Sequence, residues 1–389
     1  MRTMHSVLKH GALYWDRDLL PESLYRERLK ALQAVIAESG DEAWLLYGDV
    51  ERHGNVVYAT NFMPRVRSAL AFVPKSGAPV LLANIGLRDV PAAKTITWVD
   101  DVRPFGRLPK DLSALIEGKG LSQAAIGVCG FEESLPVADW TAIQKNLPSV
   151  RWSDRGPRLR AMRAAKQPAE VAAIRRAAGM ADAALALAPA VLRPGIPMRQ
   201  AIAAIDRHVR EAGAEDARYL VAIGAQAGVS LRPVDDRLLS AGDAVVLTMA
   251  VQSQRYWAET ARTFVLGKAS RELAELHDAA AGAVAAMQRA TKAGTASRAI
   301  AAAGHAALDD PAAATAAMYG FGNGIGLDAE EGPAIDESDR EIVVRCATLA
   351  LRAVVHRGGQ GAAAAATVVV DSGGSTALGA SSSLVELPA

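Results

Sequence analysis

The sequence predicts two domains, an α/β domain over residues 1–160 and an α+β domain over residues 161–389. Three observations support this prediction. The chain has 389 residues, more than a typical single domain. In the first part, short apolar strand patterns alternate with helical patterns. In the second part, long helical patterns are separated from longer strands, which is typical of helices that pack on a mainly antiparallel sheet.

Composition and charge exclude several classes of function. Hydrophobic residues make up 50% and charged residues 22% of the chain, as in globular proteins rather than disordered ones. A formal net charge of +1 gives no electrostatic basis for binding nucleic acid or an anionic membrane. No apolar run reaches transmembrane length, and the N-terminus has no continuous apolar segment of the kind found in signal peptides. Cys129 and Cys346 lie in separate apolar runs and are predicted to be buried thiols. We therefore expect a cytoplasmic protein.

The N-terminal domain is expected to start with a helix over 20–40, because Pro21 suits a first helical turn and Gly40 suits a helix end. Strands are then predicted at 43–47, 56–59, 69–73, 79–83, 95–99 and 125–129, and helices at 111–118 and 137–145. This order of elements gives the α/β class.

The C-terminal domain is expected to follow a junction at 159–185, in which Pro168 begins a long helix. Further helices are predicted at 197–212, 271–292 and 296–308, and strands at 219–223, 245–249, 257–266 and 343–350. The alanine-rich tracts 312–317 and 362–366 suit close packing, and alanine favours a helix where the pattern permits one.

Residues 242–267 predict the central hairpin of this domain. Residues 244–249 are an apolar run, 251–255 a polar connection, and 256–266 a second strand rich in aromatic and β-branched residues. This stretch closely resembles the paired strands of the "pita-bread" family, which contains methionine and proline aminopeptidases, prolidase and creatinase. Further matching phrases are Tyr256-Trp257, Arg262-Thr263-Phe264, the glycines Gly322, Gly324 and Gly326, and Glu331-Gly332-Pro333. The resemblance implies a creatinase-like N-terminal domain and a pita-bread C-terminal domain.

The metal ligands of the family do not match this chain. In the family's metallopeptidases, two aspartates, a histidine and two glutamates hold a pair of metal ions. The matching positions here are Thr248, Glu259, Asn323, Arg352 and Ala365. Only Glu259 keeps a carboxylate, and Arg352 brings a fixed positive charge to a position where a cation would bind. The resemblance therefore implies a member that holds neither a metal nor another cofactor.

Creatinase is the family's precedent for cleaving a C–N bond without a metal, and it uses a histidine base. The matching position here is Ser230 or Leu231, depending on the alignment, and the family's second pocket histidine is matched by Glu330. Both imidazoles are therefore replaced, and a different set of acids and bases is needed.

The resemblance brings several remaining polar residues toward one cavity. Glu259 and Glu330 are the expected acid/base pair, because neighbouring carboxylates drive their pKa values apart. Glu331 and His356 are further catalytic candidates. Arg352 is expected to bind a substrate carboxylate, and the other expected substrate contacts are Asn323, Thr248, Arg262 and Tyr256.

The same residues also permit a structural interpretation. Arg352 and Glu259 can form a buried ion pair in an inert core that replaces the charge balance of the lost metals. Arg262 is compatible with a structural arginine at a strand end, and Glu330 and Glu331 with solvated loop residues.

Arg65 and Arg67 are the notable residues of the N-terminal domain. In creatinase-like dimers, the corresponding segment reaches the partner's pocket and supplies an arginine to the substrate carboxylate. The resemblance therefore implies a homodimer whose N-terminal domain lines the partner's pocket. A solvated strand edge with two positive charges is the alternative.

The expected function is metal-independent hydrolysis or elimination at a C–N or related bond of a small carboxylate-bearing metabolite. The first alternative is a catalytically inactive pseudo-peptidase that acts as a binding module. The second is a metallopeptidase of the Xaa-Pro type.

Overall fold

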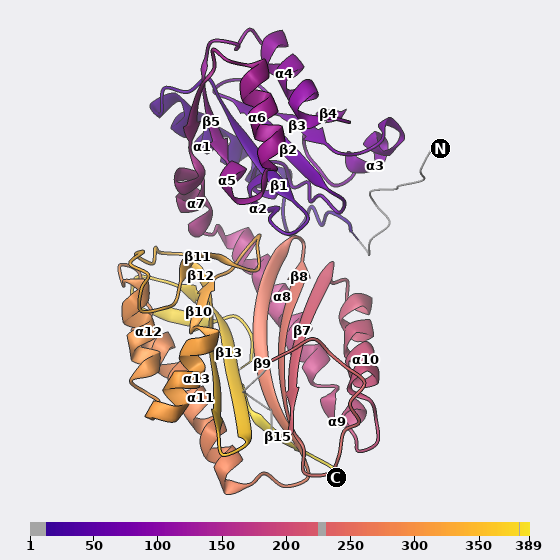
Figure 1. Cartoon of the computed structure of the whole chain (residues 1–389), viewed down its shortest axis with the longest axis vertical. Helices are drawn as coiled ribbons and strands as arrows, with labels where there is room; N and C mark the ends of the chain where they lie inside the picture. Colours follow the sequence, from indigo (N-terminus) through magenta and orange to yellow (C-terminus); the bar gives the residue numbers. More distant parts are fainter. Residues whose placement is uncertain (1–12, 225–230, 381) are drawn as a thin grey trace. The chain divides into compact units, whose positions relative to one another are not determined.

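The structure is a computed structural model, and it describes residues 13–224, 231–380 and 382–389 (Figure 1). The chain divides into two compact units, Met1–Arg163 and Ala164–Ala389, each with its own sheet. Among the described residues, no helix combines the length and the apolar character needed to cross a membrane.

The N-terminal unit is built on a six-stranded sheet in the order β4-β3-β2-β1-β5-β6. β1 pairs antiparallel with β2 and parallel with β5, so the sheet is mixed. Its strands are β1 (Ala43–Asp49), β2 (Ser68–Pro74), β3 (Val80–Ala83), β4 (Asp101–Pro104), β5 (Ala125–Cys129) and β6 (Arg151–Asp154). Its helices are α1 (Glu22–Glu38), α2 (Gly54–Thr60), η1 (Leu87–Asp89), α3 (Val90–Ala93), α4 (Leu108–Gly118), α5 (Phe131–Ser134), α6 (Val137–Asn146) and α7 (Gly156–Ala164). Apolar residues of β1, β2 and β5 form its core with α4 and α6.

Two strand predictions in this unit are wrong. Residues 56–59 lie in α2, where the Thr60 hydroxyl donates to the Val56 carbonyl and Asn61 ends the helix at φ 60°. Every residue of α2 except Asn55 is buried, and periodicity alone does not distinguish a short buried helix from a strand. Residues 95–99 form turns rather than a strand, and the strand starts only at Asp101. β6 was not predicted.

The C-terminal unit is built on a nine-stranded sheet. Its main path runs β11-β10-β12-β13-β9-β8-β7, while β14 pairs with β13 and β15 pairs parallel with β9. The strands are β7 (Asp216–Ile223), β8 (Ala244–Ser253), β9 (Tyr256–Leu266), β10 (Gly322–Gly324), β11 (Glu331–Ala334), β12 (Thr348–Arg357), β13 (Gln360–Val370), β14 (Ser375–Ala377) and β15 (Leu384–Leu387). The helices are α8 (Pro168–Leu185), α9 (Ala188–Val191), α10 (Met198–Glu211), α11 (Arg271–Ala290), α12 (Ser297–His305) and α13 (Asp310–Tyr319).

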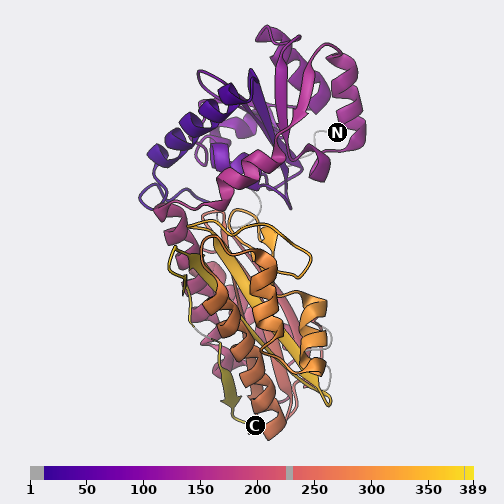
Figure 2. The same cartoon turned by 90° about the vertical axis from the view of Figure 1, so that its left-hand side faces the viewer.

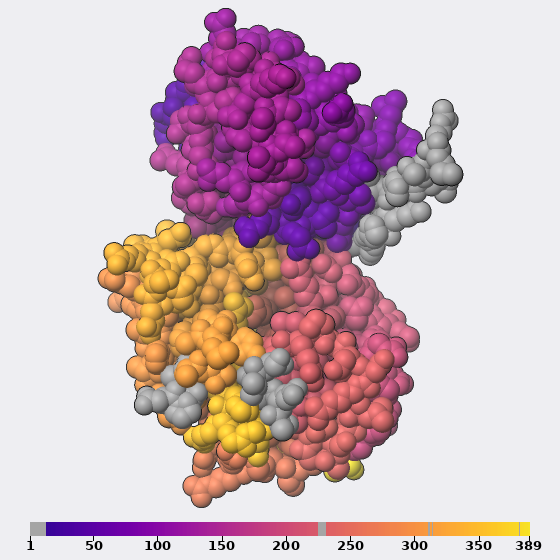
Figure 3. Space-filling view, in the orientation of Figure 1, coloured from indigo at the N-terminus to yellow at the C-terminus, as the bar shows by residue number. Residues whose placement is uncertain are grey.

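Two groups of helices cover different parts of this sheet (Figures 1 and 2). Leu247 and Phe264 pack with residues of α8 and α10, such as Ala181 and Ile205. Residues of β12 and β13 pack instead with α11, α12 and α13. Figure 3 shows the same unit in space-filling form, with its rose-red and orange parts both at the surface on this face. The remaining sheet face, which bears Glu259, carries the site described below.

The central hairpin is tighter than the sequence predicted. The strands pair as far as Ser253 and Tyr256, so the polar connection shrinks to Gln254 and Arg255, both at positive φ. The Glu215 carboxylate accepts hydrogen bonds from the backbone N–H and from Nη1 of Arg255, at 2.7 and 2.8 Å. Because this ion pair is fully buried, the polar residues of the turn belong to the interior rather than to a solvent loop.

Other differences concern the second half of the unit. β12 starts at Thr348 rather than at residue 343 and runs to Arg357, and β13 and α13 were not predicted. β13 contains the alanine tract 362–366, whose composition favours a helix but whose residues are held in register with β12. Cys346 is half-buried rather than buried, whereas Cys129 is buried.

Candidate functional site

Strand register brings the expected site positions onto one face of the C-terminal sheet. Thr248 pairs with Ala261, Ala261 with Ala365, and Ala365 with Arg352. Directly paired residues point to the same face, so these four side chains form one row across four strands. Glu259 is two residues from Ala261 and therefore shares this face.

Asn323 belongs to the same face through the neighbouring strand. It pairs with Ala350, which is two residues from Arg352. The five positions that match the family's ligand positions are therefore together in space, as the resemblance implied. The sequence alone did not determine this, because the pairing partners are up to about a hundred residues apart in the chain.

Arg352 and Glu259 form an ion pair at this site. Nη1 of Arg352 donates to both carboxylate oxygens of Glu259, at 2.9 and 2.7 Å. Nη2 donates to Oδ1 of Asn323 at 2.6 Å. The side chains of Arg352 and Glu259 are 21% and 14% exposed, so the pair is largely shielded from water. This arrangement matches the structural interpretation of these residues.

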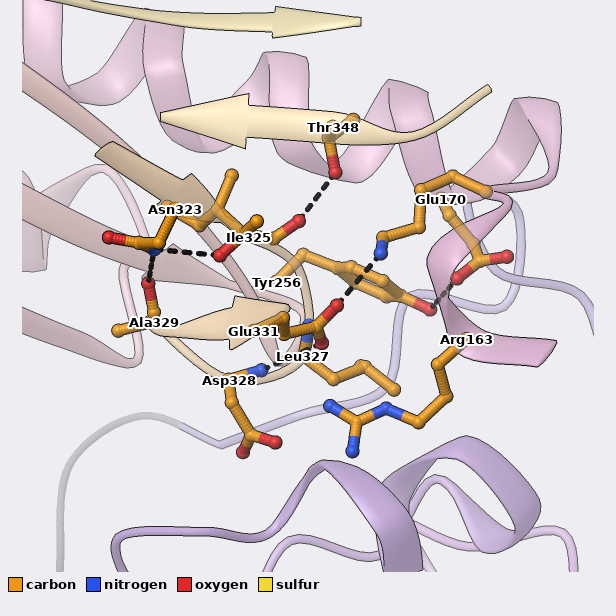
Figure 4. A network of polar contacts seen from close by, with 12 residues as sticks. Arg163, Glu170, Tyr256, Asn323, Ile325, Leu327, Asp328, Ala329, Glu331 and Thr348 are labelled. Atoms are coloured by element: carbon orange, nitrogen blue, oxygen red, sulfur yellow. Dashed lines mark hydrogen bonds and ion pairs between the residues drawn. The ribbon is translucent and has the colours of Figure 1, made fainter. Parts of the chain in front are cut away.

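The amide of Asn323 is fixed by backbone carbonyls. Its Nδ2 donates to the carbonyls of Gly324 and Ala329, at 2.7 and 3.1 Å (Figure 4). This leaves Oδ1 to accept from Arg352. Burial disfavours the charged form of Arg352, but the attraction and hydrogen bonds of Glu259, with a smaller effect of Glu330, raise its pKa above the ordinary value. The guanidinium is therefore a permanent cation in this site.

Gly322 and Gly324, on either side of Asn323, are needed because the backbones of the neighbouring strands approach them closely. A Cβ at Gly322 would lie 2.0 Å from the carbonyl oxygen of Ala350, and one at Gly324 would lie 2.1 Å from that of Gly332. Any other residue at these two positions would displace β10 from its neighbours. The glycine phrase thus sets the position of Asn323 between β11 and β12.

Glu331 lies in a separate buried network (Figure 4). One carboxylate oxygen accepts from Nζ of Lys166 at 2.8 Å, and the other accepts from the backbone N–H groups of Leu327 and Asp328. These bonds hold the loop that follows the glycine phrase. Glu331 therefore has a structural position here, while Glu330 is exposed and only influences Arg352 through its charge.

Tyr256 and Arg262 do not face the cavity, which corrects the expectation for both. Their positions alternate with Glu259 along β9, so their side chains point to the opposite face. The Tyr256 hydroxyl donates to Glu170 of α8 at 3.0 Å. Arg262 contacts Asp182 of the same helix at 3.2 Å and the Ser383 hydroxyl at 3.0 Å.

The positions of the other predicted residues do not decide whether these residues have the predicted roles. Thr248 is half-buried in the row described above, and His356 is half-buried on the same face as Arg352, four residues further along β12. Arg65 and Arg67 belong to the N-terminal unit, where Arg67 donates to Asn84 at 3.2 Å. The homodimer that they imply stays a prediction. Ser230 lies outside the described residues; Leu231, the other candidate, donates its backbone N–H to the Tyr319 hydroxyl.

Sequence reasoning missed a set of hydroxyl groups between β9 and β13. Thr367 Oγ1 accepts from the backbone N–H of Glu259 and donates to its carbonyl, both at 2.9 Å. Thr263 and Ser382 bridge the same two strands further along, through Ala363, Ala261 and Ala365. We call Thr263, Thr367 and Ser382 the hydroxyl seam.

A small pocket lies where β9 and β13 separate beside the seam. Its lining comes from both strands, from α8 and from the C-terminal segment, as Glu259, Thr260, Ala365, Ala366, Thr367, Ala178, Asp182, Gly379 and Ala380. The hydroxyl seam could not be predicted from the sequence. Its Thr and Ser hydroxyls bond to backbone groups that are far apart in the chain, so they form no recognisable sequence pattern.

The residues at this site do not fit a pair of divalent cations. Among the described residues, no group of three or more His, Cys, Asp or Glu side chains is placed to hold a metal ion. At the five matched positions, the single anion, Glu259, is neutralised by Arg352. Thr248, Ala365 and an Asn323 whose oxygen binds the guanidinium add no further negative charge.

Comparison with known proteins gives matches along most of the chain. Residues 28–165 match the family described as Creatinase/Prolidase N-terminal domain, and residues 172–372 match Metallopeptidase family M24. A probable dipeptidase PepE of Mycobacterium tuberculosis is 27% identical over 273 residues, which is 68% of this chain and 70% of that protein. The Xaa-Pro dipeptidase of Pyrococcus horikoshii is 24% identical over 55% of this chain and 62% of that protein.

A solved structure has a similar fold. The X-Pro aminopeptidase of Thermotoga maritima superposes with a TM-score of 0.81 at 20% identity, and the match covers 92% of this chain and 99% of that one. The predicted fold, a creatinase-like N-terminal domain followed by a pita-bread domain, is confirmed.

Proposed function

Because this chain belongs to Metallopeptidase family M24, we propose that it binds a short peptide or another small carboxylate-bearing ligand beside Arg352 and Glu259. It acts as a binding member of the family and does not hydrolyse the ligand through a pair of metal ions. The observation that carries this proposal is the ion pair at 2.7 Å, which fills the site with a guanidinium.

Arg352 retains donor capacity for a ligand. The hydrogen bonds described for Arg352 join Nη1 to Glu259 and Nη2 to Asn323, and none of them uses Nε. An arginine edge is suited to a carboxylate, and the negative charge of Glu259 favours a ligand that also bears an amine. A dipeptide offers both groups. The relatives' names, Xaa-Pro dipeptidase and probable dipeptidase, point to the same ligand class.

An Xaa-Pro peptidase is the second candidate function. The relatives favour it over the metal-independent hydrolase or lyase expected from the sequence. A metal-independent hydrolase or lyase would also need Glu259 to exchange protons. Both oxygens of that carboxylate, however, accept hydrogen bonds from Arg352. The residues at the matched ligand positions favour binding over metal-dependent cleavage.

The test is calorimetric titration of the full chain with Xaa-Pro dipeptides, with and without added Mn²⁺, alongside a hydrolysis assay. We expect binding that does not need Mn²⁺ and no turnover. Arg352→Met is expected to weaken binding at least about tenfold, whereas Arg345→Met, which removes an exposed ion pair with Asp371, leaves it unchanged.

Two outcomes contradict the proposal. Mn²⁺-dependent cleavage by the wild-type chain would establish the peptidase function instead. Absence of binding by every dipeptide, and by carboxylate-bearing amino acids in a thermal-shift screen, would exclude a ligand site of this chemistry.

A further inference from the structure

Arg352 reaches Glu259 by crossing a whole strand. Arg352 pairs with Ala365 of β13, and Ala365 pairs with Ala261 of β9, so β13 lies between the two charged residues. β12 and β9 are not hydrogen-bonded neighbours, although some of their Cα atoms lie within 8 Å of one another. The side chains of Arg352 and Glu259 meet at 2.7 Å. The ion pair must therefore lie over β13.

The residue beneath this crossing is small. Ala365 is in the row between Arg352 and Ala261 and is 1% exposed, so its methyl group is covered. A longer side chain at this position would point from the same face into the space that the guanidinium and carboxylate occupy. The alanine at position 365 and the arginine at position 352 are therefore sterically linked.

The crossing also joins β9 to β10 and β12, two strands with which β9 shares no strand pairing among the described residues. β13 and β9 pair directly only at Ala365 and Ala261 among the described residues. The Arg352 guanidinium contacts Glu259 of β9 and Asn323 of β10, while its own backbone belongs to β12. One cationic group thus connects β9, β10 and β12, and its charge balances that of Glu259.

We propose that the Arg352 guanidinium is a built-in structural cation. It links β9, β10 and β12 on this face of the sheet, and it needs a small residue at position 365. Its positive charge excludes divalent cations from the site. This role goes beyond the proposed ligand binding because it requires no ligand. It also accounts for a sheet of the metallopeptidase family in which the residues at the matched ligand positions do not suit a metal ion.

The first test uses the wild-type chain. Its thermal midpoint is measured with EDTA and with excess Mn²⁺, and its metal content is measured after dialysis against Mn²⁺. We expect an unchanged midpoint and no stoichiometric metal. A bound pair of ions with a raised midpoint would overturn the proposal, because the guanidinium would then not exclude cations.

The second test is a double-mutant cycle on Arg352 and Glu259. Arg352→Met leaves a buried carboxylate without its partner, so we expect the midpoint to fall by about 10 °C. Arg352→Met/Glu259→Met is expected to fall less, because no charge is left unpaired. Arg345→Met is the matched control, since that arginine pairs with Asp371 at the surface. Additive losses in the double variant would contradict a structural cation.

The third test replaces the cation with carboxylates. Arg352→Glu/Ala365→Glu places acidic side chains on β12 and β13 beside Glu259, a donor set that suits a hard cation. We expect this variant to gain Mn²⁺ binding and a midpoint that rises with Mn²⁺. If it fails to fold without metal, refolding with Mn²⁺ is the readout. No effect of Mn²⁺ in either form would contradict the link between positions 352 and 365. Dipeptide binding plays no part in these readouts, so the two proposals can fail separately.

Discussion

Individual residues at the site were identified from the sequence, but their contacts were not. Arg352 and Glu259 were expected to be either a substrate anchor with an acid/base group or a buried ion pair. The distance of 2.7 Å between them supports the ion pair. Tyr256 and Arg262 were placed in the cavity by their match to a family phrase, and the alternation of side chains along β9 puts them on the other face.

His277 is a second residue whose environment only the structure reveals. It lies on α11 and is 6% exposed, and its Nε2 is buried with no hydrogen-bond partner among the described residues. Nδ1 lies 3.8 Å from the Asp278 carboxylate. Burial lowers the pKa of His277 below its ordinary value, in spite of the opposing effect of Asp278.

This lowered pKa predicts a loss of stability in acid. In the window just below the unfolded pKa of about 6.5, the unfolded chain binds more protons than the folded chain. The contribution of His277 is therefore complete above that pKa and decreases as the pH falls through it, by at most about 1.4 kcal/mol per pH unit. Urea unfolding at about pH 8 and about pH 5 measures it. His277→Gln should lose less stability over this range than the wild type; an equal loss in both would mean that His277 does not contribute.

At the scale of elements, the sheet of the C-terminal unit depends on side chains as well as on strand pairing. Between β9 and β13, the hydroxyl seam of Thr263, Thr367 and Ser382 bonds with backbone groups where the ladder is interrupted. Backbone groups in an interior need such partners, because water does not reach them. The sequence predicted β9 but not β13, and it did not indicate that the two strands separate.

Thr367→Val tests the seam. Valine keeps the shape but removes both hydrogen bonds to Glu259, leaving its N–H and carbonyl without partners, so we expect the free energy of unfolding to fall by about 2 kcal/mol. Urea denaturation measures the change. Thr376→Val, at an exposed position of β14, is the control and should change stability little. A loss no larger than that of the control would show that the seam is not needed.

At the scale of the whole chain, two units each contain their own sheet and core. The C-terminal unit, Ala164–Ala389, has a nine-stranded sheet with separate apolar clusters against α8–α10 and against α11–α13. The N-terminal unit has its own cluster around β1, β2 and β5. The proposed ligand site and the Arg352 crossing lie entirely in the C-terminal unit.

A fragment of residues 164–389 is therefore expected to fold without the N-terminal unit. Its thermal unfolding should be a single cooperative transition, and its circular dichroism should indicate both helix and strand. The fragment of residues 1–163 is the matched comparison. A C-terminal fragment without a cooperative transition would mean that its core needs the rest of the chain.

The sequence by itself determined the family and the two-domain fold, because local phrases carry that information; the loss of the family's ligand residues stays a prediction from the identity of single side chains. It located most long helices and the central hairpin through their periodicity. Only the tertiary structure decided that Arg352 crosses β13 to Glu259, that Asn323 turns its oxygen toward the guanidinium, and that Glu331 binds Lys166. These contacts depend on strand register and on the space left by Ala365, and both arise when residues far apart in the chain are packed together.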